Sequence, residues 1–213
     1  MIDEQTQKRR GSFWRELPIL LGVAVLVAVL VRAFVLQTFY IPSPSMEHTL
    51  NILDRVLVNK LVYDFRDPHR GEIVVFKAPA DWRSGPEGED FIKRIIGVGG
   101  DHVVCCDDEQ RITVNGRALV EPYIYTDGDG TQDPPADKAF DVTVPDGRLW
   151  VMGDHRSASG DSLEHWGQTE DITAATIDSD AVVGRAFVLF WPVDRATWLS
   201  VPSTFDKVPA ATQ

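Results

Sequence analysis

Residues 91–101 read FIKRIIGVGGD, a short apolar run closed by glycines and an aspartate. Written as a β-strand, the run places Lys93 on the same face as Phe91 and Ile95, because side chains alternate along a strand. Burying an ammonium group costs free energy, so we expect a lowered pKa and an accessible neutral amine that can act as a base. The alternative is that the lysine stem covers apolar surface while its charged end reaches water.

Short apolar runs of this kind continue on both sides of the lysine run. They lie between turns rich in Pro, Gly and Asp, which is typical of antiparallel sheets. The predicted strands are 55–63, 72–77, 91–98, 102–104, 111–114, 140–144, 149–152 and 181–191. The letters VNGR at 114–117 predict a two-residue hairpin. We therefore predict a mainly β domain of antiparallel sheets over 37–198, with a surface excursion at 121–139 and a loosely held C-terminal tail at 199–213.

An uncharged apolar run precedes the β region, because residues 17–31 read LPILLGVAVLVAVLV. Continued to residue 36, it has about 20 residues, or roughly 30 Å of helix, which matches a bilayer core. Lysine and arginine gather before the run and are sparse just after it. The positive-inside rule then predicts a cytoplasmic segment 1–16, a transmembrane helix 17–36 and an outer part 37–213. A cleaved signal peptide is the alternative, but no small-x-small cleavage site follows the run.

Composition and charge exclude several classes of protein. The chain has 213 residues, of which 44% are hydrophobic and 25% charged, so it can bury a core and is not a disordered acidic chain. A net charge of −11 disfavours nucleic acid as a partner. The five histidines show no metal-ligand spacing, so we expect neither a metal nor a cofactor. The adjacent Cys105 and Cys106 predict either a strained vicinal disulfide or two separate thiols.

Two hydroxyl-rich segments flank the lysine run in the sequence. Residues 41–50 read IPSPSMEHTL, directly after the predicted membrane helix, and residues 152–167 read MGDHRSASGDSLEHWG. Each has an ordinary interpretation by itself, the first as a stiff linker and the second as a polar loop. Together with the lysine run they form a three-part pattern in a fixed order.

This three-part pattern resembles the bacterial type I signal peptidases. Its parts are Ser-x-Ser-Met beyond an anchor, then Lys-Arg-x-x-Gly-x-x-Gly-Asp, then Gly-Asp-x-Arg-x-x-Ser-x-Asp-Ser. The segments DRVLVNK at 54–60 and RGEIVVF at 70–76 resemble the family as well, and the likeness runs from about residue 14 to about residue 192. The Cys-Cys pair and the run GRLWVMGDHR at 147–156 are most similar to actinobacterial members.

The resemblance implies a signal-peptidase-like β catalytic domain behind one N-terminal transmembrane helix, in a single-pass protein of the cell membrane. It implies a serine endopeptidase with a Ser/Lys dyad that removes N-terminal signal peptides from exported preproteins, cutting after small residues in an Ala-x-Ala-like pattern. The implied partners are those signal peptides and the lipid bilayer, with the secretion translocon nearby.

The same resemblance implies roles for individual residues. Ser45 matches the nucleophile and Lys93 the general base. Ser43 matches the residue whose hydroxyl forms the oxyanion hole together with the Ser45 backbone N–H. Ser159 matches the serine that hydrogen-bonds and orients the lysine, and Asp161 the acidic residue that supports this region. The residues expected to line the substrate pocket are Ile41, Pro42, Leu50, Phe91 and Ile92.

The chain departs from the family pattern at three places. Pro44 stands between the two serines, where many members have glycine, which removes an N–H and stiffens the turn. Glu47-His48 replaces a dipeptide that ends in proline, and we expect no role for this histidine. Leu163 stands where many members have arginine, so Asp161 lacks its usual ion-pair partner. Arg156 is the candidate to replace it.

Three other functions stay open at this point. A Ser-His-Asp hydrolase would use Asp154 or His155, but neighbours in sequence cannot easily orient each other, and the G-x-S-x-G elbow is absent. A Ser/Lys protease of similar fold could cut a dedicated substrate or itself, which the predicted anchor disfavours. A non-catalytic, membrane-tethered β-domain would use the serines only as a linker.

Overall fold

The computed structural model describes residues 4–83 and 89–211. The chain divides into two compact units, Met1–Gln37 and Thr38–Gln213. The start of the predicted cytoplasmic segment, residues 1–3, and the end of the predicted tail, residues 212–213, lie outside the described residues.

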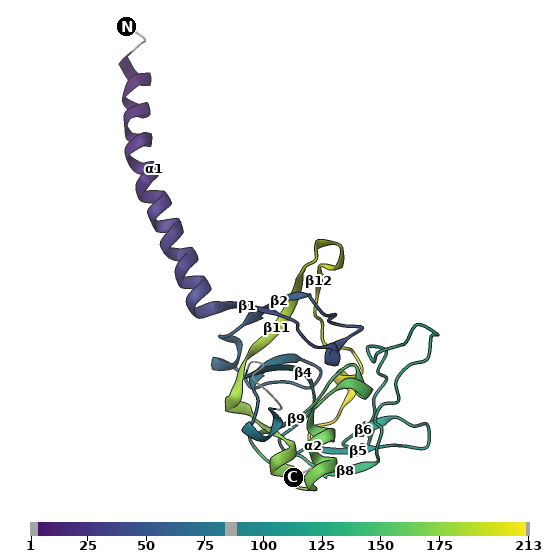
Figure 1. Cartoon of the computed structure of the whole chain (residues 1–213). Helices are drawn as coiled ribbons and strands as arrows, with labels where there is room; N and C mark the ends of the chain where they lie inside the picture. Colours follow the sequence, from purple (N-terminus) through teal and green to yellow (C-terminus); the bar gives the residue numbers. More distant parts are fainter. Residues whose placement is uncertain (1–3, 84–88, 212–213) are drawn as a thin grey trace. The chain divides into compact units, whose positions relative to one another are not determined.

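The N-terminal unit is one helix, α1, which spans Glu4–Leu30 and continues into a π-helical turn at Val31–Val35 (Figure 1). The side chains described between Leu17 and Val29 are exposed. Within the described part of the chain, no helix combines the length and the apolar character needed to cross a bilayer. The transmembrane segment 17–36 stays a prediction.

The second unit is built on an eight-stranded sheet whose neighbouring strands from β2 to β10 run antiparallel. In spatial order its strands are β1 (Leu36–Tyr40), β2 (Arg55–Asn59), β11 (Val182–Trp191), β3 (Ile73–Lys77), β4 (Asp90–Val98), β9 (Arg148–Met152) and β10 (Ile177–Asp178), and β12 (Thr197–Trp198) pairs with β11. Strand β4 lies between β3 and β9, so the lysine run occupies an inner strand.

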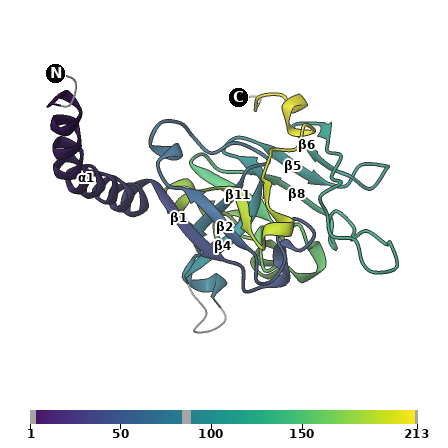
Figure 2. The same cartoon turned by 90° about the horizontal axis from the view of Figure 1, so that it is seen from above.

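A smaller antiparallel sheet lies beside the large one (Figure 2). Its order is β7 (Arg117–Ala118), β6 (Ile112–Val114), β5 (His102–Cys105) and β8 (Phe140–Thr143). The predicted hairpin is confirmed, because β6 pairs with β7 through Asn115 and Gly116. Both turn residues have positive φ, 51° and 74°, as a tight turn of this kind requires.

The mainly β fold with antiparallel sheets is confirmed, and each predicted strand overlaps an observed one. The prediction missed the strands β1, β7, β10 and β12. Strand β1 begins at Leu36, inside the predicted transmembrane segment, and the other three have two residues each, too few to show an alternation. It also missed two helices that follow the polar loop, α2 (Ser162–Thr169) and α3 (Ile172–Ala175). Each helix begins after an aspartate whose side chain accepts backbone N–H groups.

Two segments expected at the surface are partly buried. The tail packs through Phe205, which is 6% exposed and joins the apolar cluster around the small sheet. Its Pro209 carbonyl accepts a hydrogen bond of 3.0 Å from the Asn115 side chain. The excursion 121–139 begins with buried residues, including Tyr123 and Ile124. Most of residues 126–139 are exposed, as expected of a surface excursion. The packing of Phe205 and of the first residues of the excursion was not predicted, because a few apolar residues in a polar segment show no periodicity.

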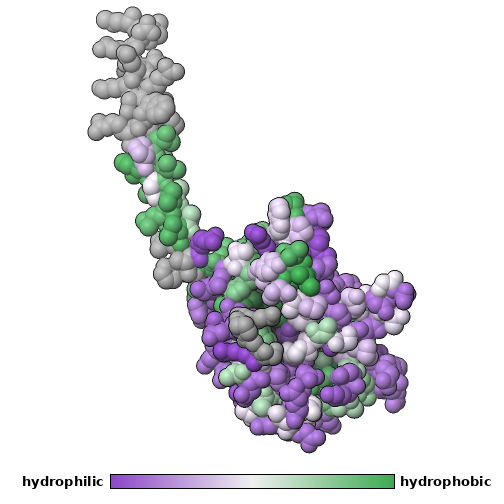
Figure 3. Space-filling view, in the orientation of Figure 1, coloured by the Kyte–Doolittle hydropathy of each residue, from purple (hydrophilic) through white to green (hydrophobic). Residues whose placement is uncertain are grey.

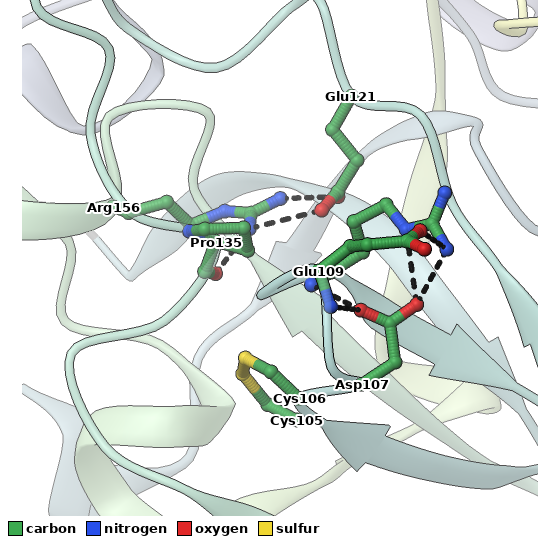
Figure 4. The surroundings of a disulfide bond; sticks show 8 residues. Cys105, Cys106, Asp107, Glu109, Glu121, Pro135 and Arg156 are labelled. Atoms are coloured by element: carbon green, nitrogen blue, oxygen red, sulfur yellow. Dashed lines mark hydrogen bonds and ion pairs between the residues drawn. A yellow bond between two sulfur atoms is a disulfide. The ribbon is translucent and has the colours of Figure 1, made fainter.

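The adjacent cysteines at the end of β5 form a vicinal disulfide (Figure 4). This decides between the two states that the sequence left open. Cys105 is buried and Cys106 packs against the apolar cluster of the small sheet.

We predict that Phe205→Ala lowers the free energy of unfolding by about 3–5 kcal/mol, because it leaves a cavity in the core. Phe65→Ala is the matched control, since Phe65 is 84% exposed and should change stability little. Chemical denaturation of both variants measures the difference. Equal midpoints for the two variants would show that the tail is not part of the cooperative fold.

Candidate active site

The predicted nucleophile lies on a short turn that packs on the core. Residues Pro44–Met46 form a 3₁₀ turn, called the serine turn below, and Pro44 occupies a first-turn position where its missing N–H costs nothing. Met46 is fully buried in the same apolar cluster as Ile41 and Leu50. The buried Met46 side chain thereby fixes the position of Ser45, which is 5% exposed and lines a cleft.

Strand β4 brings the predicted base to the same place. Its pairing with β3 sets Lys93 opposite Val74, and the lysine side chain is 4% exposed. The Lys93 Nζ lies 2.6 Å from Ser45 Oγ, a hydrogen bond between residues 48 positions apart in the sequence. The alternative in which the amine reaches bulk water is therefore wrong.

Burial sets the protonation chemistry of this amine. It lowers the pKa of Lys93 from 10.5 to about 8, although the carboxylates of Asp161 and Asp154 act in the opposite direction. Desolvation dominates because the ammonium loses its water and gains no carboxylate hydrogen bond. At slightly alkaline pH the neutral amine can accept the Ser45 proton across the 2.6 Å contact.

The other predicted hydroxyls differ in their placement. Ser43 Oγ lies 3.3 Å from Ser45 Oγ, beside the predicted nucleophile. Ser159 Oγ is buried but makes no hydrogen bond of ordinary geometry within the described residues. We expected a hydrogen bond from Ser159 to the lysine, and this expectation is wrong. The Ser159 hydroxyl lies against Gly153 instead.

The loop after β9 supports the serine turn from behind. A Cβ at Gly153 would overlap the Ser45 carbonyl oxygen and the Ser159 hydroxyl, so only glycine fits. The Gly153 N–H donates to Asp161 Oδ2 at 2.8 Å, and the Leu163 N–H donates to Asp161 Oδ1 at 3.0 Å. Asp161 thus caps helix α2 and fixes the loop at the same time.

Burial also raises the pKa of Asp161, although the hydrogen bond from the Gly153 N–H and the charges of Lys93 and Arg156 act against the rise. Arg156 does not replace the missing arginine as a direct partner. Its guanidinium bonds Glu121 at 2.6 Å and the Gly153 carbonyl at 3.0 Å. Arg156 affects the pKa of Asp161 only through its charge.

The geometry does not support a Ser-His-Asp triad. Both oxygens of Asp154 accept from the Arg94 guanidinium, at 2.8 and 2.6 Å, and one also accepts from the Thr49 hydroxyl. The ring of His155 contacts the Pro44 carbonyl and Glu47 rather than Ser45 Oγ. Asp154 is therefore a structural partner of Arg94.

An apolar cleft of about 240 Å³ opens over Ser45 and Lys93. Its lining is Pro42, Ser43, Ser45, Trp82, Asp90, Phe91, Ile92, Lys93, Ala158 and Gly160. Three of the predicted pocket residues, Pro42, Phe91 and Ile92, belong to this lining. Ile41 and Leu50 do not, because they are buried in the core behind the serine turn.

Sequence reasoning missed four lining residues, Trp82, Asp90, Ala158 and Gly160, which come from three segments. Trp82 ends a 3₁₀ turn and is held by a 2.9 Å hydrogen bond from its indole nitrogen to the Ala174 carbonyl. Ala158 and Gly160 come from the loop after β9. Their small size in a hydroxyl-rich loop was the available signal, but only the fold brings them to the cleft.

One edge of β4 is unpaired beside this cleft. Strand β3 pairs with β4 from Asp90 to Arg94, whereas β9 begins its pairing only at Arg94. Among the described strands, none covers residues 90–93 on the β9 side. The described residues also hold no group of three metal-ligating side chains.

A serine hydroxyl on a buried lysine amine, beside an apolar cleft and an unpaired strand edge, is the arrangement typical of a serine peptidase with a lysine base. Residues 14–191 match a family model described as signal peptidase, peptidase S26. The chain belongs to this family.

Curated relatives agree over most of the chain. The probable signal peptidase I-2 of Synechocystis sp. is 40% identical over 217 residues, which cover 100% of this chain and 91% of the relative. Signal peptidase I of Mycobacterium tuberculosis is 35% identical over 229 residues, covering 91% and 77%. Signal peptidase I of Leptolyngbya laminosa is 37% identical over 187 residues, covering 87% and 83%.

We predict that Lys93→Met stabilises the protein at pH 6–7 by about 3 kcal/mol, which is the free energy of the pKa shift from 10.5 to about 8. Below about pH 8 the folded wild type carries a buried charge that methionine lacks. Between about pH 8 and 10.5 the folded state releases its proton before the unfolded state does, so wild-type stability rises with pH. Denaturant titrations across this range should show the gap closing. A gap that is constant with pH would contradict the lowered pKa.

Proposed function

We propose that this chain is a membrane-anchored signal peptidase I that removes N-terminal signal peptides from exported preproteins. Family membership and the names of the curated relatives support this function. The single observation that carries the mechanism is the 2.6 Å contact between Ser45 Oγ and the buried Lys93 Nζ.

The catalytic cycle uses Ser45 as nucleophile and Lys93 as general base and acid. The neutral amine takes the hydroxyl proton while Oγ attacks the scissile carbonyl carbon. The Ser45 N–H and the Ser43 hydroxyl hold the oxyanion, and each such donor contributes roughly 2.7–4 kcal/mol. The protonated amine then gives its proton to the leaving amine, which releases the mature protein. A water that loses its proton to Lys93 hydrolyses the acyl ester and frees the signal peptide.

The substrate binds in an extended conformation along the unpaired edge of β4 at residues 90–93. Backbone hydrogen bonds to a free strand edge give affinity without regard to sequence, while pockets beneath alternate side chains give specificity. The cleft of about 240 Å³ beside Phe91 and Ile92 favours small side chains at −1 and −3, an Ala-x-Ala-like pattern. Asp161 and Gly153 support the loop that closes this cleft.

The anchor keeps the reaction at the membrane. Residues 17–36 span the bilayer, 1–16 lie in the cytoplasm, and the catalytic domain 37–198 lies outside. Ser45 follows residue 36 by nine positions, which span at most about 30 Å of extended chain. The nucleophile therefore works close to the bilayer, where preproteins leave the translocon.

Exposed apolar side chains support contact between the catalytic domain and lipid. Trp191 and Trp198 are 51% and 73% exposed, and Val193 between them is also exposed. Figure 3 has apolar surface at the end of the domain that carries β12. Exposed tryptophans of this kind favour the interface between water and lipid.

We predict that Ser45→Ala and Lys93→Met each reduce cleavage of a purified Ala-x-Ala preprotein by at least about 10³-fold, because each removes one half of the dyad. Lys207→Met is the matched control, since Lys207 is an exposed lysine in the C-terminal tail. Appearance of the mature protein on a gel measures the rate. Retained cleavage in either dyad variant would refute the mechanism and favour a different active site.

We also predict that kcat/KM rises with pH through about 8 and then levels off. The lysine must be neutral to act as a base, and burial lowers its pKa from 10.5 to about 8. The measurement is a pH–rate profile at substrate concentrations well below KM, with folding checked at each pH. An inflection near 10.5 would mean that the working amine is not desolvated.

A further inference from the structure

One histidine contacts the serine turn at several points. The backbone N–H of His155 donates to the Ser45 carbonyl at 3.2 Å. Its ring Nδ1 lies 3.2 Å from the Pro44 carbonyl and 3.2 Å from Glu47 Oε2. Both neighbours are acceptors, so this geometry assigns the proton to Nδ1. A single residue thereby holds the residues before, at and after the predicted nucleophile.

The ring of His155 is itself held in place. It stacks on Tyr125 with ring centroids 3.8 Å apart and an interplanar angle of 17°. On the other side, Nε2 lies 4.0 Å from Asp133 Oδ2, and the same oxygen accepts from the Ser157 N–H and hydroxyl at 2.9 Å each. The side chain is only 14% exposed. The donor therefore points at the serine turn before any substrate arrives.

The excursion 121–139 supplies the partners that hold this histidine. The Tyr125 N–H donates to the Asp154 carbonyl at 2.8 Å, directly before His155. His48, just after the serine turn, bonds the Ile124 carbonyl through Nδ1 at 2.8 Å. Arg156 bonds Glu121 and the Pro135 carbonyl, which joins the loop after β9 to both ends of the excursion (Figure 4).

We propose that His155 is a positioning residue for Ser45. Its Nδ1–H and backbone N–H hold the serine turn so that Ser45 Oγ stays on Lys93 Nζ and the Ser45 N–H stays directed at the oxyanion. The proposal rests on the proposed function, in which Ser45 is the nucleophile. His155 acts through the turn and does not line the cleft that takes the substrate. In this proposal the excursion contributes to catalysis, because its residues Tyr125 and Asp133 orient the His155 ring.

Position matters more here than binding. A misplacement of about 1 Å at a reacting group can cost on the order of 10²-fold in rate. Loss of the ring donor should therefore lower kcat while KM stays near its wild-type value. A side chain that only stabilised the fold would instead lower the unfolding midpoint and leave the kcat of the folded fraction unchanged.

Two substitutions separate the donor from the ring. His155→Phe keeps an aromatic ring to stack on Tyr125 and removes the donor, whereas His155→Asn keeps an N–H near the Nδ1 position and removes the stack. His102→Phe is the control, since His102 is an exposed histidine of the small sheet. We expect His155→Phe to lower kcat at least about 10-fold with KM within about 2-fold, and His155→Asn to restore most of the loss.

The assay uses the full chain, an Ala-x-Ala preprotein and a thermal unfolding curve for each variant. A His155→Phe kcat equal to that of wild type would overturn the proposal. Equal losses in the Phe and Asn variants, together with lowered unfolding midpoints, would overturn it as well, because they indicate a structural role.

A second substrate separates this proposal from the proposed function. The burst of p-nitrophenol from p-nitrophenyl acetate reports acylation of Ser45, with Ser45→Ala as the blank. If wild type does not cleave the preprotein, the proposed function fails. The burst rate of His155→Phe against wild type still decides the positioning role: a slower burst supports it, and an equal burst refutes it.

Discussion

A lysine amine buried against a serine hydroxyl is the constraint on which the rest of this domain depends. An ammonium group without water or a carboxylate partner is unstable in a protein interior, so burial lowers the pKa of Lys93 and makes the neutral amine accessible. The same burial costs stability at neutral pH, and the surrounding structure has to tolerate that cost. The lysine lies on an inner strand of the large sheet, where β3 holds it on one side and the serine turn covers its end.

The charged side chains around Ser45 and Lys93 are paired with other groups, so none of the described carboxylates bonds directly to the Lys93 amine. Arg94, next to the lysine, is bound by both oxygens of Asp154, and Arg156 is bound by Glu121. Asp161 uses its oxygens on backbone N–H groups of Gly153 and Leu163. A carboxylate bonded directly to Lys93 would hold the amine in its charged form, so keeping each acid occupied elsewhere preserves the base. The pairing also explains why leucine is tolerated at 163, since Asp161 has backbone partners.

Local pattern predicted the strands well where they are long and alternate, as in β4 and β11, and the hairpin at Asn115 and Gly116 follows from turn chemistry alone. It failed where a residue acts through distant partners. Phe205 is a single aromatic residue in a polar segment of the sequence, yet it packs in the core of the small sheet. Ile41 and Leu50 have the apolar character of pocket residues, but they lie in the core behind the serine turn. Ser159 occupies the expected motif position, yet its hydroxyl faces Gly153 rather than the lysine amine.

The resemblance of three short motifs to a known family predicted the dyad of Ser45 and Lys93. The strand pattern by itself left open whether the lysine is buried or reaches water. The mainly β class followed from the same kind of local alternation. Only the tertiary structure decided that the amine is buried within 2.6 Å of Ser45 Oγ, that the cysteines are joined, and that His155 and the excursion contact the serine turn. Those facts depend on contacts between residues far apart in the chain. Such contacts arise from the packing of the sheets and carry no signature in the spacing of residues along the sequence.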